Sequence, residues 1–157
     1  MKKFFGLVAA LLAVSLVSFG FVACSDDDDD DPVVINYIVN DVSNAAVKAT
    51  YAGVESGTDD DGIAYTANVT VTFYEDDTWK TDTVASALGV IYMETDGSGT
   101  YTGDPSKDGT IVVKKLKTYS EGEVIQDYSS YASLTSVSTI TISDGKFKFE
   151  SVEFTKQ

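Results

Sequence analysis

The chain of 157 residues contains no histidine and no arginine, and it has a single cysteine. Without histidine, Ser-His-Asp and Cys-His catalysis and histidine-based metal sites are excluded within one chain. Without arginine, no guanidinium can clamp a phosphate or carboxylate group. The inventory leaves paired carboxylates or a Ser-Lys pair as catalytic devices, and no motif signals either one. We therefore predict a protein that is not an enzyme and assign no catalytic residue, no cofactor and no metal site.

Positive charge is also scarce, because 11 lysines face 25 aspartates and glutamates, for a formal net charge of -14. Phosphate backbones are bound by clustered lysine or arginine, so we expect no nucleic-acid partner. Loss of an amino-terminal leader that carries Lys2 and Lys3 would take the charge to about -16. This charge should keep the folded part soluble and away from anionic lipid headgroups.

One long uncharged segment is present, and it occupies residues 4–22, directly after Met1, Lys2 and Lys3. A run of about 20 apolar residues is long enough to cross a bilayer. A membrane span that stops transfer would be followed by lysine or arginine on its cytoplasmic side, and here acidic residues follow. The segment is therefore predicted to be a secretory signal peptide over residues 1–23.

The end of this segment, Phe21-Val22-Ala23-Cys24, resembles the lipobox of bacterial lipoproteins. The resemblance implies cleavage before Cys24, a diacylglycerol on its thiol and an acyl chain such as palmitate on its new amino group. Because Cys24 is the only cysteine, it has no partner for a disulfide within the chain. Two or three acyl chains, each buried CH₂ contributing about 0.8 kcal/mol, anchor a protein more firmly than one chain does.

An acidic tract, Asp26 to Asp31, follows the cysteine and is closed by Pro32. Like charges repel one another and bury no apolar surface, so residues 24–32 are predicted to form an extended tether, reaching at most roughly 28 Å. The tract resembles acidic signals that route lipoproteins to the outer membrane or cell surface of Gram-negative-type bacteria. Aspartates are also calcium ligands, but six adjacent ones without a turn glycine do not converge easily on one ion.

Residues 33–157 are predicted to form a single all-β domain, since this length supports one hydrophobic core. The clearest pattern covers residues 63–73, where apolar and polar residues alternate for eleven positions. Period two indicates a half-buried strand. A turn at residues 75–78 and a second strand from Trp79 to Val84 complete a predicted hairpin.

The remaining segments follow the same pattern, and none shows a helical period. A turn cluster is predicted at residues 95–99 and a loop at 103–109, while residues 119–134 have no clear pattern. The apolar phase changes near Glu150 and Ser151, which is typical of a β-bulge. Further strands are predicted at residues 33–39, 45–54, 88–94, 100–102, 110–118, 137–142 and 146–155.

Three stretches, VTVTFYEDDTWK (69–80), GTYTGDPSKDGTIVV (99–113) and ISDGKFKFESVEFTK (142–156), together resemble small lipocalin-like lipoproteins of bacteria. The resemblance implies a single antiparallel up-and-down barrel of about eight to ten strands. Short strands joined by turns also occur in a β-sandwich, which stays the alternative fold.

Aromatic residues supply the candidate ligand contacts, because aromatic faces stack on sugars and on apolar ligands. We assign Trp79, Tyr92 and Tyr101 as ligand-facing residues. Tyr74, Tyr119, Tyr128 and Tyr131 are further candidates. The alternative is that all of them are ordinary strand and core residues.

Three functions remain open for the membrane-anchored, monomeric lipoprotein that we expect in the cell envelope. The leading hypothesis is a non-catalytic interaction or structural module with a protein partner. The second is a lipocalin-like barrel that binds a small apolar or glycan ligand, and the third is a carboxylate-based hydrolase. A filled interior would favour the first, an open apolar cavity the second, and a pair of carboxylates in a groove the third.

Overall fold

The computed structural model describes residues 32–40, 42–58, 62–131 and 135–157. The predicted signal peptide, Cys24 and the acidic tract up to Asp31 lie outside the described residues. Among the described residues no helix is long and apolar enough to cross a bilayer. The elements of the described part are all β-strands.

Ten strands make up the domain in the described part of the chain. They are β1 (Val33–Tyr37), β2 (Val47–Thr58), β3 (Ala64–Tyr74), β4 (Thr78–Ala87), β5 (Val90–Thr102), β6 (Gly109–Ser120), β7 (Glu123–Asp127), β8 (Ser136–Ile142), β9 (Lys146–Phe149) and β10 (Val152–Lys156).

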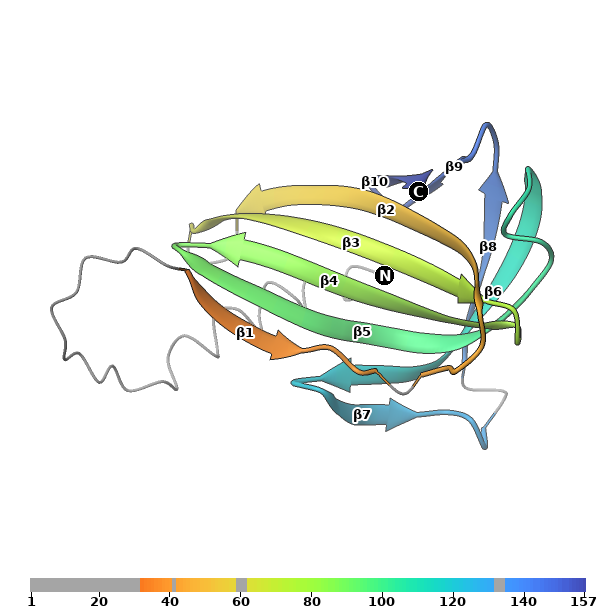
Figure 1. Cartoon of the computed structure of the whole chain (residues 1–157), viewed down its shortest axis with the longest axis horizontal. Helices are drawn as coiled ribbons and strands as arrows, with labels where there is room; N and C mark the ends of the chain where they lie inside the picture. The colour runs from red at the N-terminus through yellow and green to blue at the C-terminus, as the bar shows by residue number, and fades with distance from the viewer. Residues whose placement is uncertain (1–31, 41, 59–61, 132–134) are drawn as a thin grey trace, which may run out of the picture.

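The strands form one sheet in the order β7-β6-β5-β4-β3-β2-β10-β9, with β8 paired to β6 (Figure 1). The sequential run from β2 to β6 is antiparallel and up-and-down, which confirms the predicted all-β class. The exception is β1, which pairs in parallel with the first half of β5, with Val33 opposite Val90. The second half of β5 pairs with β6. The sheet curves around its core and is compatible with a barrel-like domain.

The sheet is not closed by a continuous ladder. In the described part, β8 and β9 are joined through the Ser143-Asp144-Gly145 turn and share one isolated bridge, between Ser143 and Lys146. On the other side, the ladder between β10 and β2 pairs only Thr155 and Lys156 of β10 with β2. The second half of β2 therefore pairs with β3 alone.

The β3–β4 hairpin follows the predicted alternation. Val69, Val71 and Phe73 are buried while Thr66 and Asn68 are exposed. The turn is tight because Asp77 adopts a left-handed backbone conformation with φ of 60°. The hairpin pairs Phe73 with Trp79, which places both large rings at the same end of the interior.

The predicted turn at residues 95–99 is wrong, because these residues lie inside β5. Their glycines serve a close approach of two strands, not a reversal of the chain. A Cβ on Gly99 would overlap the carbonyl group of Lys114 on β6. The small residue therefore lets β6 cross close to β5, where the register of the ladder also shifts.

The predicted bulge near Glu150 is also wrong, because Glu150 and Ser151 form the turn between two short antiparallel strands. Phe149 pairs with Val152 across this turn, and Phe147 pairs with Phe154. Glu150 takes a left-handed φ of 53°. A two-residue turn shifts the alternation of inward residues by one position, and a bulge would shift it in the same way.

Residues 119–134 had no clear sequence pattern, and their described part, 119–131, contains the end of β6, a Glu121-Gly122 turn and the edge strand β7. Every residue of β7 is exposed. Such a strand buries no apolar face, so it carries no alternation for a sequence pattern to reveal.

The interior holds two separate apolar clusters. The smaller cluster, at one end, contains Ala67, Ala85 and Tyr92, with Ile35, Tyr37 and Tyr65 packed against it. The larger one contains Ala49, Tyr51, Val69, Val71, Phe73, Trp79, Tyr101, Ile111, Ile140, Ile142, Phe147, Val152 and Phe154.

Candidate functional site

A cavity of about 620 Å³ lies inside the curved sheet, and its walls include members of both apolar clusters. Ligand sites in proteins typically measure about 300–1,000 Å³ and have largely apolar walls. The lining side chains come from every strand of the described part except β1, so the site depends on the folded sheet as a whole.

The apolar wall of the cavity consists of large, fixed side chains. Trp79 is 8 % exposed, and its indole nitrogen Nε1 donates to the carbonyl oxygen of Thr100 at 3.0 Å. The rings of Phe147 and Phe154 are stacked, with centroids 4.8 Å apart. Val69, Val71, Phe73, Val113, Ile140 and Phe149 complete this wall.

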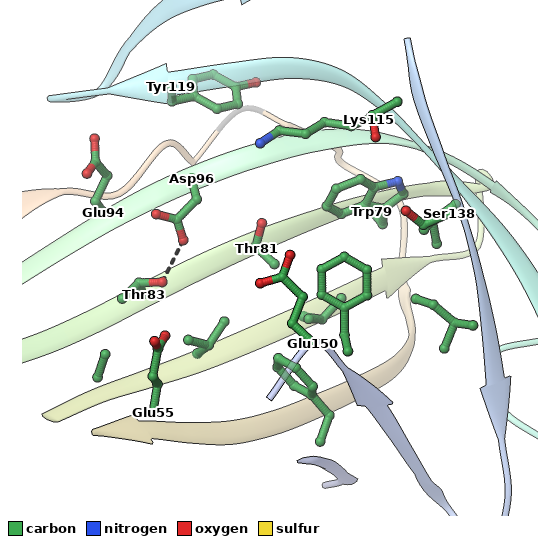
Figure 2. A pocket seen from close by; sticks show the side chains of 18 of the residues that line it. Glu55, Trp79, Thr81, Thr83, Glu94, Asp96, Lys115, Tyr119, Ser138 and Glu150 are labelled. Atoms are coloured by element: carbon green, nitrogen blue, oxygen red, sulfur yellow. Dashed lines mark hydrogen bonds between the residues drawn. The ribbon is translucent and has the colours of Figure 1, made fainter. Parts of the chain in front are cut away.

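Polar side chains form a belt on the wall between the two clusters. We use the name polar belt for Thr81 and Thr83 of β4, Glu94 and Asp96 of β5, and Lys115 of β6 (Figure 2). Along β4 the inward residues therefore change from Trp79 through two threonines to Ala85. The belt gives the largely apolar cavity a set of polar groups on three neighbouring strands.

Asp96 is an acidic residue of the belt whose pKa is shifted from its usual value. The hydroxyl of Thr83 donates to its Oδ2 at 2.5 Å. Burial in the cavity wall raises the pKa of Asp96 to about 7, with the nearby charge of Glu94 adding to the rise. A carboxyl group with this pKa is partly protonated at neutral pH.

Lys115 lies on β6, the strand next to β5, and its amine points toward β5 on the same wall as Asp96 (Figure 2). Burial lowers the pKa of Lys115 to about 8, although the negative charge of Asp96 opposes this fall. The side chain runs across Gly97, where an added Cβ would lie 2.5 Å from its Cε. The glycine thus provides the space that lets Lys115 reach into the cavity.

Glu94 is the most buried charged residue of the belt, at 2 % exposure. Its Oε1 accepts from the backbone N–H of Glu121 at 2.6 Å, and its Oε2 accepts from the hydroxyl of Tyr92 at 3.2 Å. Burial raises the pKa of Glu94 in spite of these hydrogen bonds. Because each of its oxygens already has a donor, Glu94 mainly ties β5 to the β6–β7 turn.

The rim of the cavity is acidic and exposed in part. Glu55 is half-buried and accepts from the hydroxyl of Tyr65 at 3.4 Å. Burial raises the pKa of Glu55, and the charge of Glu150 adds to this rise. Glu150, Gln126 and Ser136 are exposed lining residues and mark the side that faces solvent.

The three aromatics assigned from the sequence occupy different places. Trp79 lines the cavity. Tyr101 is buried in the larger cluster and donates to the carbonyl oxygen of Tyr74 at 2.7 Å. Tyr92 is buried in the smaller cluster beside Glu94. Cys24, the assigned lipid attachment site, lies outside the described residues.

The other tyrosines divide in the same way. Tyr119 lines the cavity, and its hydroxyl shares a hydrogen bond of 3.0 Å with the hydroxyl of Ser98. Tyr128 and Tyr131 lie on the turn after β7, and Tyr131 is 63 % exposed. Tyr65, which was not among the sequence candidates, also lines the cavity.

Sequence reasoning missed Asp96 and Lys115, although a signal for each was present. Lys115 continues the inward phase of Ile111 and Val113 along β6. Asp96 continues the phase of Tyr92 and Glu94 along β5. The neighbouring glycines and serine suggested a turn and hid this alternation.

Comparison with known proteins adds no information about the site. No protein-family model, curated protein or solved structure matches the chain. Among the described residues, no group of three or more histidine, cysteine, aspartate or glutamate side chains is placed to hold a metal ion.

Proposed function

We propose that this chain is a lipid-anchored envelope protein whose β domain binds a small, mostly apolar ligand. The observation that carries the proposal is the cavity of about 620 Å³ inside the sheet. An open apolar cavity is the feature that favours a binding protein over an interaction module with a filled interior. The curvature of the sheet and the resemblance to lipocalin-like lipoproteins support the same function.

The wall chemistry supports an apolar body for the ligand. Phe73, Trp79 and Phe147 present aromatic surface to the cavity, and several valines surround them. Removing apolar ligand surface from water contributes about 25 cal/mol per Å², so binding strength should grow with the length of an apolar tail. A site built to bind sugars alone would present more polar groups on this wall.

The carboxylates of the site support binding better than hydrolysis. A carboxylate-based hydrolase needs one acid and one base or nucleophile on either side of the bond that is cut. Glu94 is held by two hydrogen bonds, and Asp96 by Thr83. Glu55 and Glu150 belong to the rim. Because Glu94 and Asp96 are held by hydrogen bonds within the cavity wall, we propose a binding role for this site over a carboxylate-based hydrolase.

Anchoring rests on the sequence features of residues 1–31. The predicted signal peptide ends at a lipobox-like Cys24, and the acidic tract follows it directly. Strand β1 begins at Val33, directly after the predicted tether. The domain would therefore stand within about 28 Å of the lipid surface, close enough to exchange an apolar ligand with the envelope.

Native mass spectrometry of the full chain, purified from a bacterial envelope, tests the binding function. We expect a retained small-molecule adduct. A matched pair of variants shows whether it sits in the cavity: Val113→Phe fills the lining, while Val112→Phe adds the same ring on the outer face, where Val112 is 37 % exposed. The adduct should be lost from Val113→Phe and kept by Val112→Phe. A bare mass, together with no response of Trp79 fluorescence to apolar probes, would reject the proposal.

A further inference from the structure

The polar belt determines where the head group of a bound ligand must lie. The apolar wall includes Trp79 and Phe154, and the polar belt, which includes Thr81 and Thr83, lines the same cavity. A ligand whose tail fills the apolar wall therefore brings its polar end to the belt. This inference rests on the proposed function and concerns the chemistry of that polar end.

Asp96 offers an acceptor at this position. Thr83 donates to Oδ2 of Asp96, so Oδ1 is the oxygen left to accept a hydrogen bond from a ligand. Thr83 is itself 4 % exposed, which fixes the orientation of the carboxyl group. A ligand group that donates a hydrogen bond would thus find a rigid acceptor.

Lys115 of the neighbouring strand β6 offers donors, since an ammonium group donates hydrogen bonds and accepts none. Its stem is held against Gly97 of β5, and its amine points toward Asp96 in Figure 2. Acceptor and donor thus come from neighbouring strands and point into one cavity.

A charged head group would be unfavourable here. A carboxylate or phosphate would approach Asp96 and Glu94 in a chain of formal charge -14. An ammonium group would have to compete with Lys115 for the charge of Asp96, because these two groups already attract each other. A buried charge without a full partner costs several kcal/mol, whereas a neutral hydroxyl can donate to Asp96 and accept from Lys115 at once.

From this arrangement we propose that the polar belt recognises an uncharged, hydroxyl-bearing amphiphile, of the class of long-chain alcohols and monoacylglycerols. The Asp96 carboxylate accepts from the hydroxyl, and the Lys115 amine donates to it. The apolar wall takes the tail. Selectivity among ligands with equal tails is then set by Asp96 and Lys115.

Four probes with the same tail test this selectivity: dodecanol, dodecanoate, dodecylammonium and dodecane. Binding to the full chain can be followed by the fluorescence of Trp79, the only tryptophan and a lining residue. The protein should be held in an amphipathic polymer, since an alkyl detergent would compete for the cavity. We expect dodecanol to bind about tenfold more tightly than each other probe, as the gain from satisfied hydrogen bonds predicts.

Two variants should shift the selectivity in opposite directions. Asp96→Asn removes the carboxylate charge that acts on Lys115, so dodecanoate should gain about tenfold relative to dodecanol. Lys115→Met leaves Asp96, so dodecylammonium should gain instead. Lys117→Met is the matched control, because Lys117 lies on the same strand outside the lining and faces Asp127 at 3.9 Å.

The outcomes separate the two proposals. Equal affinities for all four probes, unchanged by Asp96→Asn and Lys115→Met, would overturn the head-group inference while the binding function stands. No binding of any probe would reject the binding function itself. Either belt variant alone is sufficient for the test, so a folding defect in one leaves the other to decide; circular dichroism identifies such a defect.

Discussion

At the scale of single residues, Asp96 makes the stability of the fold depend on pH. Its pKa in the folded chain is raised to about 7, whereas an unfolded aspartate has a pKa of about 3.9. Between about pH 4 and pH 7, Asp96 is therefore largely protonated in the folded state and largely ionised in the unfolded state. The contribution of Asp96 to stability is complete below about pH 4 and is lost as the pH rises to about 7.

We predict that Asp96→Asn removes this loss. The variant should be more stable than the wild type at pH 8, by on the order of 2 kcal/mol, because Asp96 is only half-buried and solvent reduces the full effect of the pKa shift. The difference should vanish toward pH 4. Urea unfolding at several pH values, followed by Trp79 fluorescence, measures it.

Asp104 provides a control of opposite sign. Hydrogen bonds from Ser106, followed by its contact with Lys107, hold the pKa of Asp104 well below its usual range. Asp104→Asn should therefore lose stability relative to the wild type above about pH 4. If Asp96→Asn shows the same trend as Asp104→Asn, Asp96 does not lie in a desolvating wall.

Asp96 and Lys115 show what a sequence can reveal at the scale of single residues. The phase of Ile111 and Val113 points Lys115 inward, so its side chain could be placed from the sequence. Its role could not, because a lysine on an inward phase is equally compatible with a strand end that faces water. That Gly97 makes room for Lys115 becomes visible only in the paired strands.

At the scale of elements, the β9–β10 hairpin depends on one strained turn residue. Glu150 has a φ of 53°, and a left-handed conformation costs an ordinary L-residue roughly 1–2 kcal/mol. We predict that Glu150→Asn stabilises the fold by about 0.5–1 kcal/mol, because asparagine tolerates this conformation better. The midpoint of urea unfolding should rise with little change in its slope.

Ser151 is the matched control for this prediction. It is the other turn residue, and its φ is not positive. Ser151→Asn should leave the unfolding midpoint almost unchanged. A gain at residue 151 and none at residue 150 would indicate a different turn geometry, and the assignment of the hairpin would then be wrong.

Strands with one buried face were predictable, and strands without that contrast were not. The alternation of residues 63–73 predicted β3 to within one residue at each end. The exposed β7 carries no such contrast. In β5, the glycines that allow β6 to cross made a continuous strand look like a turn, and in β9–β10 a turn without glycine or asparagine looked like a bulge.

At the scale of the whole molecule, composition and pattern predicted one all-β domain, and they could not predict the cavity. Alternation identifies which residues point inward, but not whether the inward side chains fill the space. That depends on the small or short residues at facing positions, such as Thr81, Thr83 and Gly97, and on the curvature of the sheet. Both are properties of the assembled strands.

Membrane anchoring belongs to the same scale, because Cys24 would tether the entire domain. We predict that the full chain incorporates labelled palmitate when it is produced in a bacterium, and that Cys24→Ser abolishes both this labelling and removal of residues 1–23. Two or three acyl chains, at about 0.8 kcal/mol per buried CH₂, should keep the cut wild-type chain with the membrane fraction. Intact mass spectrometry measures cleavage and lipid together.

Ser25→Ala is the neighbouring control and should be cut and labelled like the wild type, because only the thiol of Cys24 carries the lipid. If Cys24→Ser is still cut and released without lipid, residues 1–23 are an ordinary signal peptide, and the domain is secreted free. The ligand site would be unaffected by that result, since the described lining residues all lie between Glu55 and Phe154. Its supply of ligand would then come from solution and not from the envelope, so the two parts of the proposed function can fail separately.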